Sequence, residues 1–336
     1  MCNVSVITIF KRRHKKVKEC LNSLINQTLS NTEIICIYKE ENSDIDRFVK
    51  ETQEKYNNIN IIYKTKAQDV TAKNKALEEA QGKYILVMNG DMCLEKTTLE
   101  KLYNVQERND TDIAICGFNI IDINTNQLIH EGLNNKFKEV EEINGKNENF
   151  AYLNLDGGNK LIKKEIARNI KFQNYDECQD EIFILSCYSK ANKISFINEQ
   201  LCYKYEDNSN KNLKNQVQIK DLKDGLVEVK KLYKDAGKYE KLKNMLTFIA
   251  FTRIGMRALI ELTVTKNGDL KDNIRDVMNY LDINFFEWRK NPFLKLKNVP
   301  RKKYWIAYTM YKYGFQQLFI KIYSKPIEKG NKLLII

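Results

Sequence analysis

Short apolar runs alternate with amphipathic segments along the first third of the chain. Short runs rich in β-branched residues predict buried strands, and apolar residues spaced three or four positions apart predict helices. On this basis we expect strands at Val4–Phe10, Glu33–Tyr38, Ile59–Tyr63, Tyr84–Met88 and Asp112–Ile121, separated by helices at Lys15–Gln27, Ile45–Tyr56, Val70–Ala80 and Thr97–Gln106. Strands that alternate with helices in this way predict an α/β fold, Rossmann-like, with a mainly parallel central sheet.

The pattern is less regular beyond residue 121. Residues 132–150 are polar and predict a surface loop with a short helix. We then expect helices at Ile162–Asn169 and Glu181–Ala191, followed by strands at Ile194–Ile197 and Leu201–Tyr205. Residues 216–336 read as successive helices with few strand signals. The sequence therefore predicts two domains, an α/β domain at 1–207 and an α-helical region at 208–336.

Charge follows the same division. The chain of 336 residues has a net charge of +12, but residues 211–336 hold 27 Lys and Arg against 12 Asp and Glu. The basic character therefore belongs to the C-terminal region, where it predicts an anionic partner. The sequence has no zinc-finger or RNA-binding signature, so we do not expect that partner to be nucleic acid.

The cysteines and the hydropathy indicate a cytoplasmic protein. None of the eight cysteines forms a C-x-x-C pair, and several lie within apolar runs, as Cys36 and Cys116 do. We therefore expect buried, reduced thiols rather than a zinc cluster. The chain opens without a leader-like segment, and no apolar run reaches the roughly 18 residues of a membrane span. These features suit a reducing compartment.

The candidate chemistry begins directly after the strand at Tyr84–Met88, where the chain reads Asn89-Gly90-Asp91. In open α/β sheets, ligands bind beyond the carboxyl ends of the strands. Mg²⁺ and similar hard cations prefer carboxylate oxygens and often join them to phosphates. Taken alone, the same three residues are also typical of an ordinary turn.

Four segments of the chain together form a recognisable pattern. They are VSVITIF with KECLNSLINQTLSNTEIICI (4–10 and 18–37), TAKNKALEEAQGKYILVMNGD (71–91), NKLIKKEIARNIKF (159–172) and QDEIFILSCYSKANKISFINEQLCYKY (179–205). In this order and spacing, from Val4 to about Tyr205, they resemble the family 2 glycosyltransferases, which have the GT-A fold.

The resemblance implies roles for four residues. Asp91 matches the last aspartate of the family's metal motif and would bind Mn²⁺ or Mg²⁺. Asn89 replaces the first aspartate; its amide oxygen can accept a hydrogen bond from a ribose hydroxyl but carries no charge. Asp180, after Gln179, matches the catalytic base, although an aspartate there also suits a helix N-cap. Lys73 is the implied diphosphate contact.

Two stretches depart from the family pattern. Ile9-Phe10-Lys11-Arg12 replaces the usual Pro-x-Tyr-Asn, and Tyr38-Lys39-Glu40-Glu41 replaces the usual Asp-Asp-Gly-Ser. The usual base-recognising carboxylate is therefore missing. Lys39, Lys11 and Arg12 are candidates for phosphate contacts instead, with solvated surface cations as the alternative.

The function that the resemblance implies is inverting transfer of a sugar from a nucleotide-diphosphate donor. The acceptor would be a hydroxyl of a glycan or a lipid-linked molecule, as in polysaccharide biosynthesis. The alternative is a degenerate domain without catalytic activity that binds a glycan or a partner enzyme, which the changes at Asn89 and Lys39 suggest.

The end of the chain is the most basic part. Residues 289–336 hold 12 Lys and Arg and one acid, Glu328. This composition predicts a region that binds an anionic membrane peripherally, on its inner face. The alternative is a helical core or an oligomerisation element. The aromatic residues interleaved with this charge are Trp305, Tyr308, Tyr311, Tyr313, Phe315, Phe319 and Tyr323.

Overall fold

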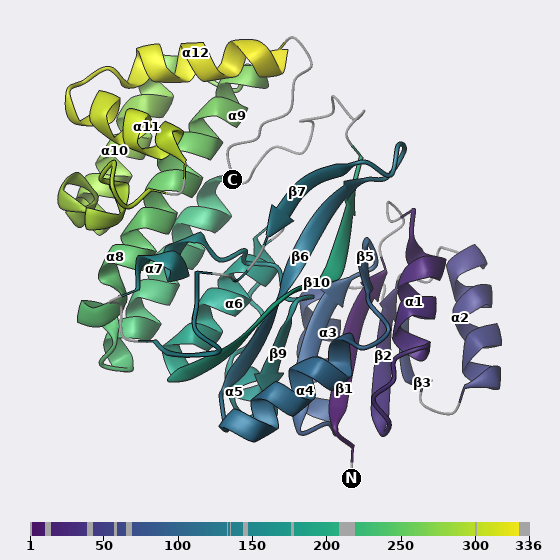
Figure 1. Cartoon of the computed structure of the whole chain (residues 1–336). Helices are drawn as coiled ribbons and strands as arrows, with labels where there is room; N and C mark the ends of the chain where they lie inside the picture. The colour runs from purple at the N-terminus through teal and green to yellow at the C-terminus, as the bar shows by residue number, and fades with distance from the viewer. Residues whose placement is uncertain are drawn as a thin grey trace. The chain divides into compact units, whose positions relative to one another are not determined.

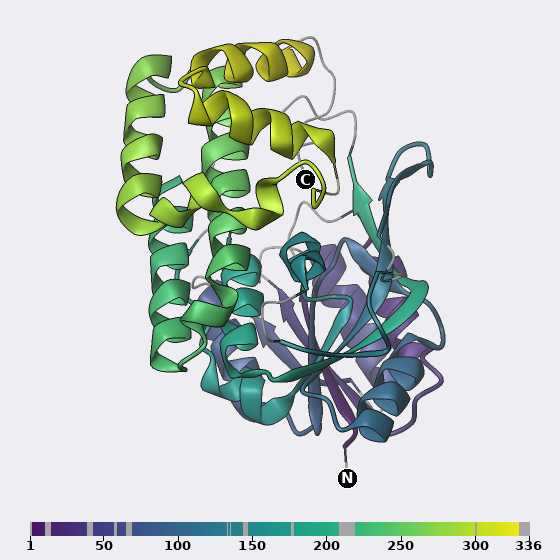
Figure 2. The same cartoon turned by 60° about the vertical axis from the view of Figure 1, so that its left-hand side comes forward.

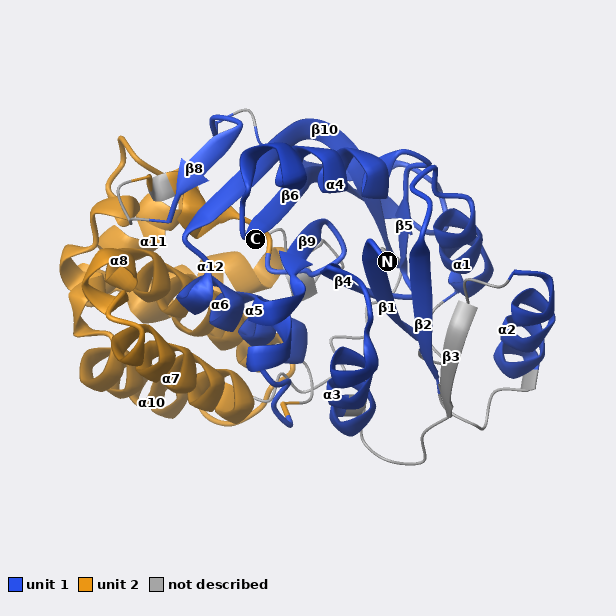
Figure 3. Ribbon diagram, turned by 90° about the horizontal axis from the view of Figure 1, so that it is seen from below, with its two compact units in different colours: residues 1–143, 155–174, 179–207 blue, residues 144–154, 175–178, 208–336 orange. Residues whose placement is uncertain are grey.

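The chain divides into two compact units in a computed structural model (Figure 3). Unit 1 comprises residues 1–143, 155–174 and 179–207, and unit 2 comprises residues 144–154, 175–178 and 208–336. The structure describes residues 2–10, 15–38, 43–56, 59–64, 69–132, 134, 136–143, 147–175, 178–207, 219–299 and 301–328.

Unit 1 is built on one sheet, whose described strands run in the order β3-β2-β1-β4-β9-β6-β10-β5 (Figure 1). Strands β3, β2, β1 and β4 are mutually parallel, as are β6 and β10. β7 pairs with β6, and β8 pairs with β10. The strands are β1 (Val4–Phe10), β2 (Thr32–Tyr38), β3 (Ile59–Lys64), β4 (Tyr84–Asn89), β5 (Met92–Leu94), β6 (Ile113–Asp122), β7 (Leu128–Gly132), β8 (Val140–Glu142), β9 (Lys160–Lys163) and β10 (Lys193–Glu206).

Helices connect the parallel strands, as the alternation predicts. They are α1 (Val17–Ile25), α2 (Ser43–Lys55), α3 (Asp69–Glu79), α4 (Thr98–Asn109), α5 (Lys164–Asn169) and α6 (Gln179–Lys190). All seven residues of β1 are buried, and so are Val17, Cys20, Leu21 and Leu24 of α1. The predicted α/β class with a mainly parallel central sheet is confirmed by this pairing. A strand covered on both faces is mostly apolar rather than alternating, as at Val4–Phe10, where only Ser5 and Thr8 are polar.

Three local expectations are wrong. Residues 160–163 form β9, an antiparallel strand between β4 and β6, and the expected helix begins only at Lys164. The expected pair of strands after residue 193 is one strand, β10, with bulges near Ile197 and Cys202. The polar stretch 132–150 also contributes a strand, β8, which pairs with β10, while the short helix expected there is present as a 3-10 helix that begins at Glu148. Short strands such as β8 and β9 are decided by the strands they pair with rather than by their own periodicity.

Unit 2 is helical in its described part, as expected for this region (Figure 2). A π-helix continues α8 directly. Aromatic rings form the core of unit 2: the ring of Phe251 stacks on that of Trp288 at 5.2 Å and meets that of Tyr311 edge-on at 5.3 Å. The elements are η1 (Glu148–Tyr152), α7 (Ile219–Asp235), α8 (Tyr239–Ala250), η2 (Phe251–Ala258), α9 (Leu259–Val264), α10 (Leu270–Asn284), η3 (Phe286–Lys290), η4 (Pro292–Leu294), α11 (Lys302–Lys312) and α12 (Gln316–Glu328). Among the described helices, none is both long enough and apolar enough to cross a lipid bilayer.

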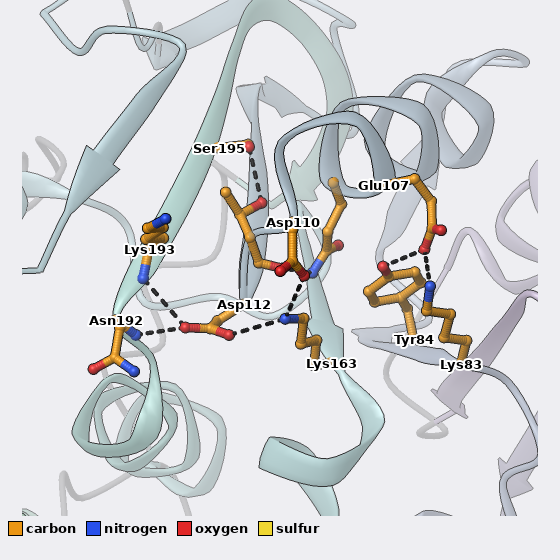
Figure 4. A network of polar contacts seen from close by, with 11 residues as sticks. Lys83, Tyr84, Glu107, Asp110, Asp112, Lys163, Asn192, Lys193 and Ser195 are labelled. Atoms are coloured by element: carbon orange, nitrogen blue, oxygen red, sulfur yellow. Dashed lines mark hydrogen bonds and ion pairs between the residues drawn. The ribbon is translucent and has the colours of Figure 1, made fainter.

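A polar network ties together the amino ends of parallel strands in unit 1 (Figure 4). Asp112, just before β6, accepts hydrogen bonds from the backbone N–H groups of Asn192 and Lys193 at the start of β10. Lys163 at the end of β9 pairs with Asp110 at 3.0 Å and with Asp112 at 3.3 Å. The network fixes the register of β6, β9 and β10, and therefore where their opposite ends lie.

Gly82, in the turn between α3 and β4, gives a first test of the fold. A Cβ at this position would lie 2.3 Å from the backbone nitrogen of Ser5 and 2.6 Å from the carbonyl carbon of Val4. We expect Gly82→Ala to lower the free energy of unfolding by about 1–3 kcal/mol, because β1 would have to shift. Urea unfolding measures this. Gln81→Ala, at an exposed neighbour, is the matched control and should change little; equal stability of the two variants would contradict the close approach.

Candidate active site

The Asn89-Gly90-Asp91 turn lies at the carboxyl end of β4, where the sequence places it. Its backbone is held from two sides. The Gly90 N–H donates to the carbonyl of Ile9 in β1 at 2.8 Å, and the carbonyl of Asp91 accepts from the N–H of Tyr205 in β10 at 2.8 Å. The turn is therefore fixed between two strands of the sheet.

Asp180, the implied base, meets two of the other candidates. Its Oδ1 accepts a hydrogen bond from Lys73 Nζ at 2.8 Å, and its Oδ2 accepts one from Asn89 Nδ2 at 2.8 Å. Lys73 also donates to Oε1 of Gln179 at 3.0 Å. The structure thus brings together three site residues that lie on β4, α3 and α6.

Asp180 is the second residue of α6, within the first helical turn. An N-cap residue precedes the helix, so this position differs from that of a cap. A carboxylate in the first turn is stabilised by the helix dipole. Its side chain is 26% exposed, which leaves it accessible to a substrate.

Lys73 is buried, with its side chain 2% exposed. A buried ammonium needs partners to offset its lost hydration. Besides Asp180 and Gln179, it lies 4.8 Å from the centre of the Phe172 ring, and that ring stacks on Phe183 of α6. The contact of Lys73 with a diphosphate, which the resemblance implies, stays a prediction. In the structure Lys73 donates a hydrogen bond to Asp180.

The neighbouring residue, Asn74, holds the same part of the chain. Its side chain donates to the carbonyl of Phe172 at 2.9 Å and accepts from the N–H of Phe172 at 2.8 Å. The Lys73-Asn74 pair therefore fixes Phe172 by its ring and by its backbone. Since Phe172 packs on Phe183, this pair anchors α6, and with it Asp180, to α3.

The residues present suit a hard divalent cation with few protein ligands. Asn89 Oδ1 is buried and has no hydrogen-bond partner among the described residues. Asp91 contributes a carboxylate two positions along. Within the described part of the chain, no group of three or more His, Cys, Asp or Glu side chains is placed to hold a metal. Mg²⁺ is commonly held by one or two protein oxygens together with phosphates and water, so this donor set fits.

A glycine loop that the sequence analysis did not single out lies against the same turn. A Cβ on Gly157 would lie 2.4 Å from the carbonyl oxygen of Val87, near the end of β4. A Cβ on Gly158 would lie 2.6 Å from Cε of Met92, at the start of β5. The adjacent glycines in Asp156-Gly157-Gly158-Asn159 were the available signal, since a backbone that must approach another backbone closely favours glycine.

Two lysines beside this loop differ in how firmly they hold their proton. Lys204 lies 3.2 Å from both carboxylate oxygens of Asp156. The charge of Asp156 raises the pKa of Lys204, although burial acts in the opposite direction, and Asp91 adds to the rise. Burial lowers the pKa of Lys160 to about 8. The firmly held positive charge beside Asp91 is therefore that of Lys204, which the sequence analysis missed.

The remaining candidates cannot be placed. Lys39, Lys11 and Arg12 lie outside the described residues. Tyr38, the last residue of β2, is described: its hydroxyl donates to Oδ1 of Asp46 in α2 at 2.6 Å, and burial raises the pKa of this tyrosine.

Comparison with known proteins identifies the family. Residues 5–171 match the sequence model of Glycosyl transferase family 2. The chain therefore belongs to glycosyltransferase family 2 through this segment. The match includes Lys73, Asn89 and Asp91 and ends before Asp180.

Characterised relatives are similar over part of their length. The chain is 30% identical to the cholesterol galactosyltransferase of Borreliella burgdorferi over 210 residues, which is 58% of each protein. It is 26% identical to the poly(ribitol-phosphate) beta-glucosyltransferase of Bacillus spizizenii over 57% of this chain and 30% of that protein. The chain thus spans about a third to three fifths of these relatives.

A solved structure extends the likeness in fold. Residues 1–349 of S. aureus TarS, in complex with UDP-GlcNAc, match with a TM-score of 0.70 and 15% identity. The match covers 98% of this chain and 93% of that chain. The expected GT-A fold is therefore confirmed.

Asn89→Asp tests the contact between Asn89 and Asp180. The change removes the amide donor and places a second carboxylate against Asp180. We expect the free energy of unfolding to fall by about 1.5 kcal/mol or more without divalent cations. Mn²⁺ should restore more thermal stability to this variant than it adds to the wild type, because a cation neutralises adjacent carboxylates.

Thermal denaturation with and without Mn²⁺ measures both effects. Asn89→Ala is the control, since it removes the hydrogen bond and adds no charge. A cation-free Asn89→Asp protein as stable as the wild type would show that Asn89 does not donate to Asp180.

Proposed function

We propose that the protein transfers a sugar from a nucleotide-diphosphate donor to a hydroxyl group, with inversion at the anomeric carbon. The observation that carries this proposal is the position of Asp180. A partly exposed carboxylate, held by side chains from two other elements, lies beside the Asn89-Gly90-Asp91 turn at the carboxyl end of the sheet. Membership of glycosyltransferase family 2 supports the reaction class.

In this proposal Asp180 is the general base. It accepts the proton of the acceptor hydroxyl as that oxygen attacks the anomeric carbon, and the bond from this carbon to the diphosphate breaks. Lys73 and Asn89 each hold one carboxylate oxygen, so they fix the direction in which the remaining lone pairs point. One carboxylate suffices, because the leaving diphosphate does not need an acid to protonate it.

Asp91 and Asn89 Oδ1 are the protein atoms that would hold Mn²⁺ or Mg²⁺. When bound, the cation would neutralise charge that develops on the leaving diphosphate. Lys204, beside Asp91, adds a fixed positive charge on the same side. We propose Lys73 as a residue that orients Asp180, in addition to the diphosphate contact expected from the family.

The acceptor proposed is a glycan or a lipid-linked molecule. The names of the similar proteins, a cholesterol galactosyltransferase and a poly(ribitol-phosphate) beta-glucosyltransferase, describe transfer to a lipid and to a polymer. We place the reaction in the cytoplasm. None of the eight cysteines, all within the described residues, forms a disulfide, and six of them are buried, which suits a reducing compartment.

The rival function is a degenerate domain that binds a glycan or a partner enzyme without catalysis. The observation that favours it is Asn89, which removes one carboxylate from the metal motif. The two functions differ in turnover, because only the transferase releases nucleoside diphosphate.

Asp180→Asn tests the general base. We expect turnover to fall by roughly 10²-fold or more, the usual scale for a lost general base, with donor affinity nearly unchanged. Release of nucleoside diphosphate from the donor measures turnover, and calorimetry measures affinity. Thermal denaturation must accompany both measurements, because the N–H₂ group of the new asparagine would face another donor, Lys73 or Asn89, and could lower the stability of the fold. Equal losses in affinity and turnover would instead assign Asp180 a structural role.

Asp91→Ala tests the metal site. We expect the folded variant to lose the cation-dependent part of donor binding. The assay is a thermal-shift panel of nucleoside diphosphates with Mn²⁺, with Mg²⁺ and with a chelator. A ligand at roughly 100 times its Kd stabilises the folded state by about 2.7 kcal/mol, which such an assay detects. Asp156→Ala, which removes the neighbouring carboxylate, is the comparison, and undiminished cation dependence in Asp91→Ala would remove Asp91 from the site.

A further inference from the structure

Helix α12 belongs to unit 2 (Figure 1), and apolar side chains are exposed along one of its sides. Phe315, just before the helix, and Leu318 and Ile322 within it are 56%, 51% and 50% exposed. Their spacing of three and four residues places them on one side of a helix that turns about 100° per residue. Lys321 and Lys325 are exposed along one edge of the same side. We call these five residues the α12 face.

Packing in unit 2 does not account for this face. The helix packs through different residues: Phe319 and Ile320 are fully buried, and Ser324 is 2% exposed. The Phe319 ring meets Tyr311 edge-on at 5.7 Å and lies 4.4 Å from Tyr323. The expectation that the aromatic residues of this region pack a helical core thus holds for these three rings, and the α12 face is a second, separate surface.

The charge around the face is mainly positive, since α12 holds Lys321, Lys325 and a single acid, Glu328, at its last position. The sequence contains no Asp or Glu between Glu287 and Glu328. Within the described residues, Lys312, Lys321 and Lys325 take part in no ion pair with a carboxylate, and all three are exposed. Tyr313, 65% exposed, lies beside Lys312, whose Nζ is 5.8 Å from the ring centre.

We propose that the α12 face rests on a lipid surface that carries negative charge. Its apolar side chains would enter the boundary between headgroups and acyl chains, and its lysines would contact the lipid phosphates. A helix with an apolar stripe, flanking lysines and a single acid, at its last residue, has the composition of an interfacial helix. Lysines near an anionic membrane bind it by electrostatic attraction.

The same charge argues against a second copy of the chain. A two-fold contact through the α12 face would bring the lysines of two copies together, and each copy would supply two lysines, Lys321 and Lys325, against one acid, Glu328. A nucleic acid would use the lysines but would leave Phe315, Leu318 and Ile322 in water. Of these three occupants, the anionic lipid surface is the one that uses both the lysines and the apolar side chains of the face.

Vesicle co-sedimentation of the full chain tests the proposal. The wild type should bind vesicles of phosphatidylglycerol and phosphatidylcholine at low salt, and lose binding at high salt and on pure phosphatidylcholine. Replacing three lysines should weaken binding by roughly 100-fold, at about 1 kcal/mol for each cation. The charge variant is Lys312→Gln with Lys321→Gln and Lys325→Gln. The apolar variant is Phe315→Ser with Leu318→Ser and Ile322→Ser, and it should also lose binding.

Matched controls lie elsewhere on unit 2. Lys231→Gln with Lys266→Gln and Lys271→Gln removes three exposed charges. Ile283→Ser with Phe286→Ser removes two apolar side chains that are 78% and 62% exposed. Both controls should bind like the wild type. The proposal is overturned if the α12 variants bind as well as these controls, or if sedimentation velocity shows a wild-type dimer that the apolar variant converts to a monomer. None of these readouts depends on sugar transfer.

Discussion

The account of this site depends on the contact of one carboxylate with two donors. Asp180 is held by Lys73 through one oxygen and by Asn89 through the other. A lysine that is nearly fully buried is stable only because a carboxylate and an aromatic ring face it. Removing Asp180 would leave that charge uncompensated, so the site and the local fold depend on the same residue.

This contact also gives a reason for the asparagine in the metal motif. An ionised aspartate at position 89 could not donate to Asp180 and would repel it. Compared with an aspartate, the asparagine lacks a negative charge that would favour metal binding. It gains a hydrogen bond to Asp180 that orients the proposed base. On this interpretation, Asn89 departs from the family pattern because its amide holds the carboxylate of Asp180 in place. A site without catalytic activity would not need that hydrogen bond.

The sequence was sufficient for the α/β class and for the position of the Asn89 turn, because buried parallel strands are continuous apolar runs. It was not sufficient for β9 or for the single strand β10, since both are set by pairing with neighbouring strands. The contact between Lys73 and Asp180 joins residues more than a hundred positions apart, and neither hydropathy nor spacing encodes it. The partner of Lys204 was missed for the same reason, whereas the loop at Gly157 had a local signal in its two adjacent glycines.

The most direct test of the central claim follows the anomeric configuration of the sugar that the enzyme releases or transfers. Nucleotide sugars with known anomers are incubated with the protein and a divalent cation, and proton NMR records the first product before mutarotation. The account predicts an inverted product, formed roughly 10²-fold or more slowly by the Asp180→Asn protein. Retention of configuration would contradict a single carboxylate acting as base, and the absence of release from every donor that binds would contradict catalysis itself.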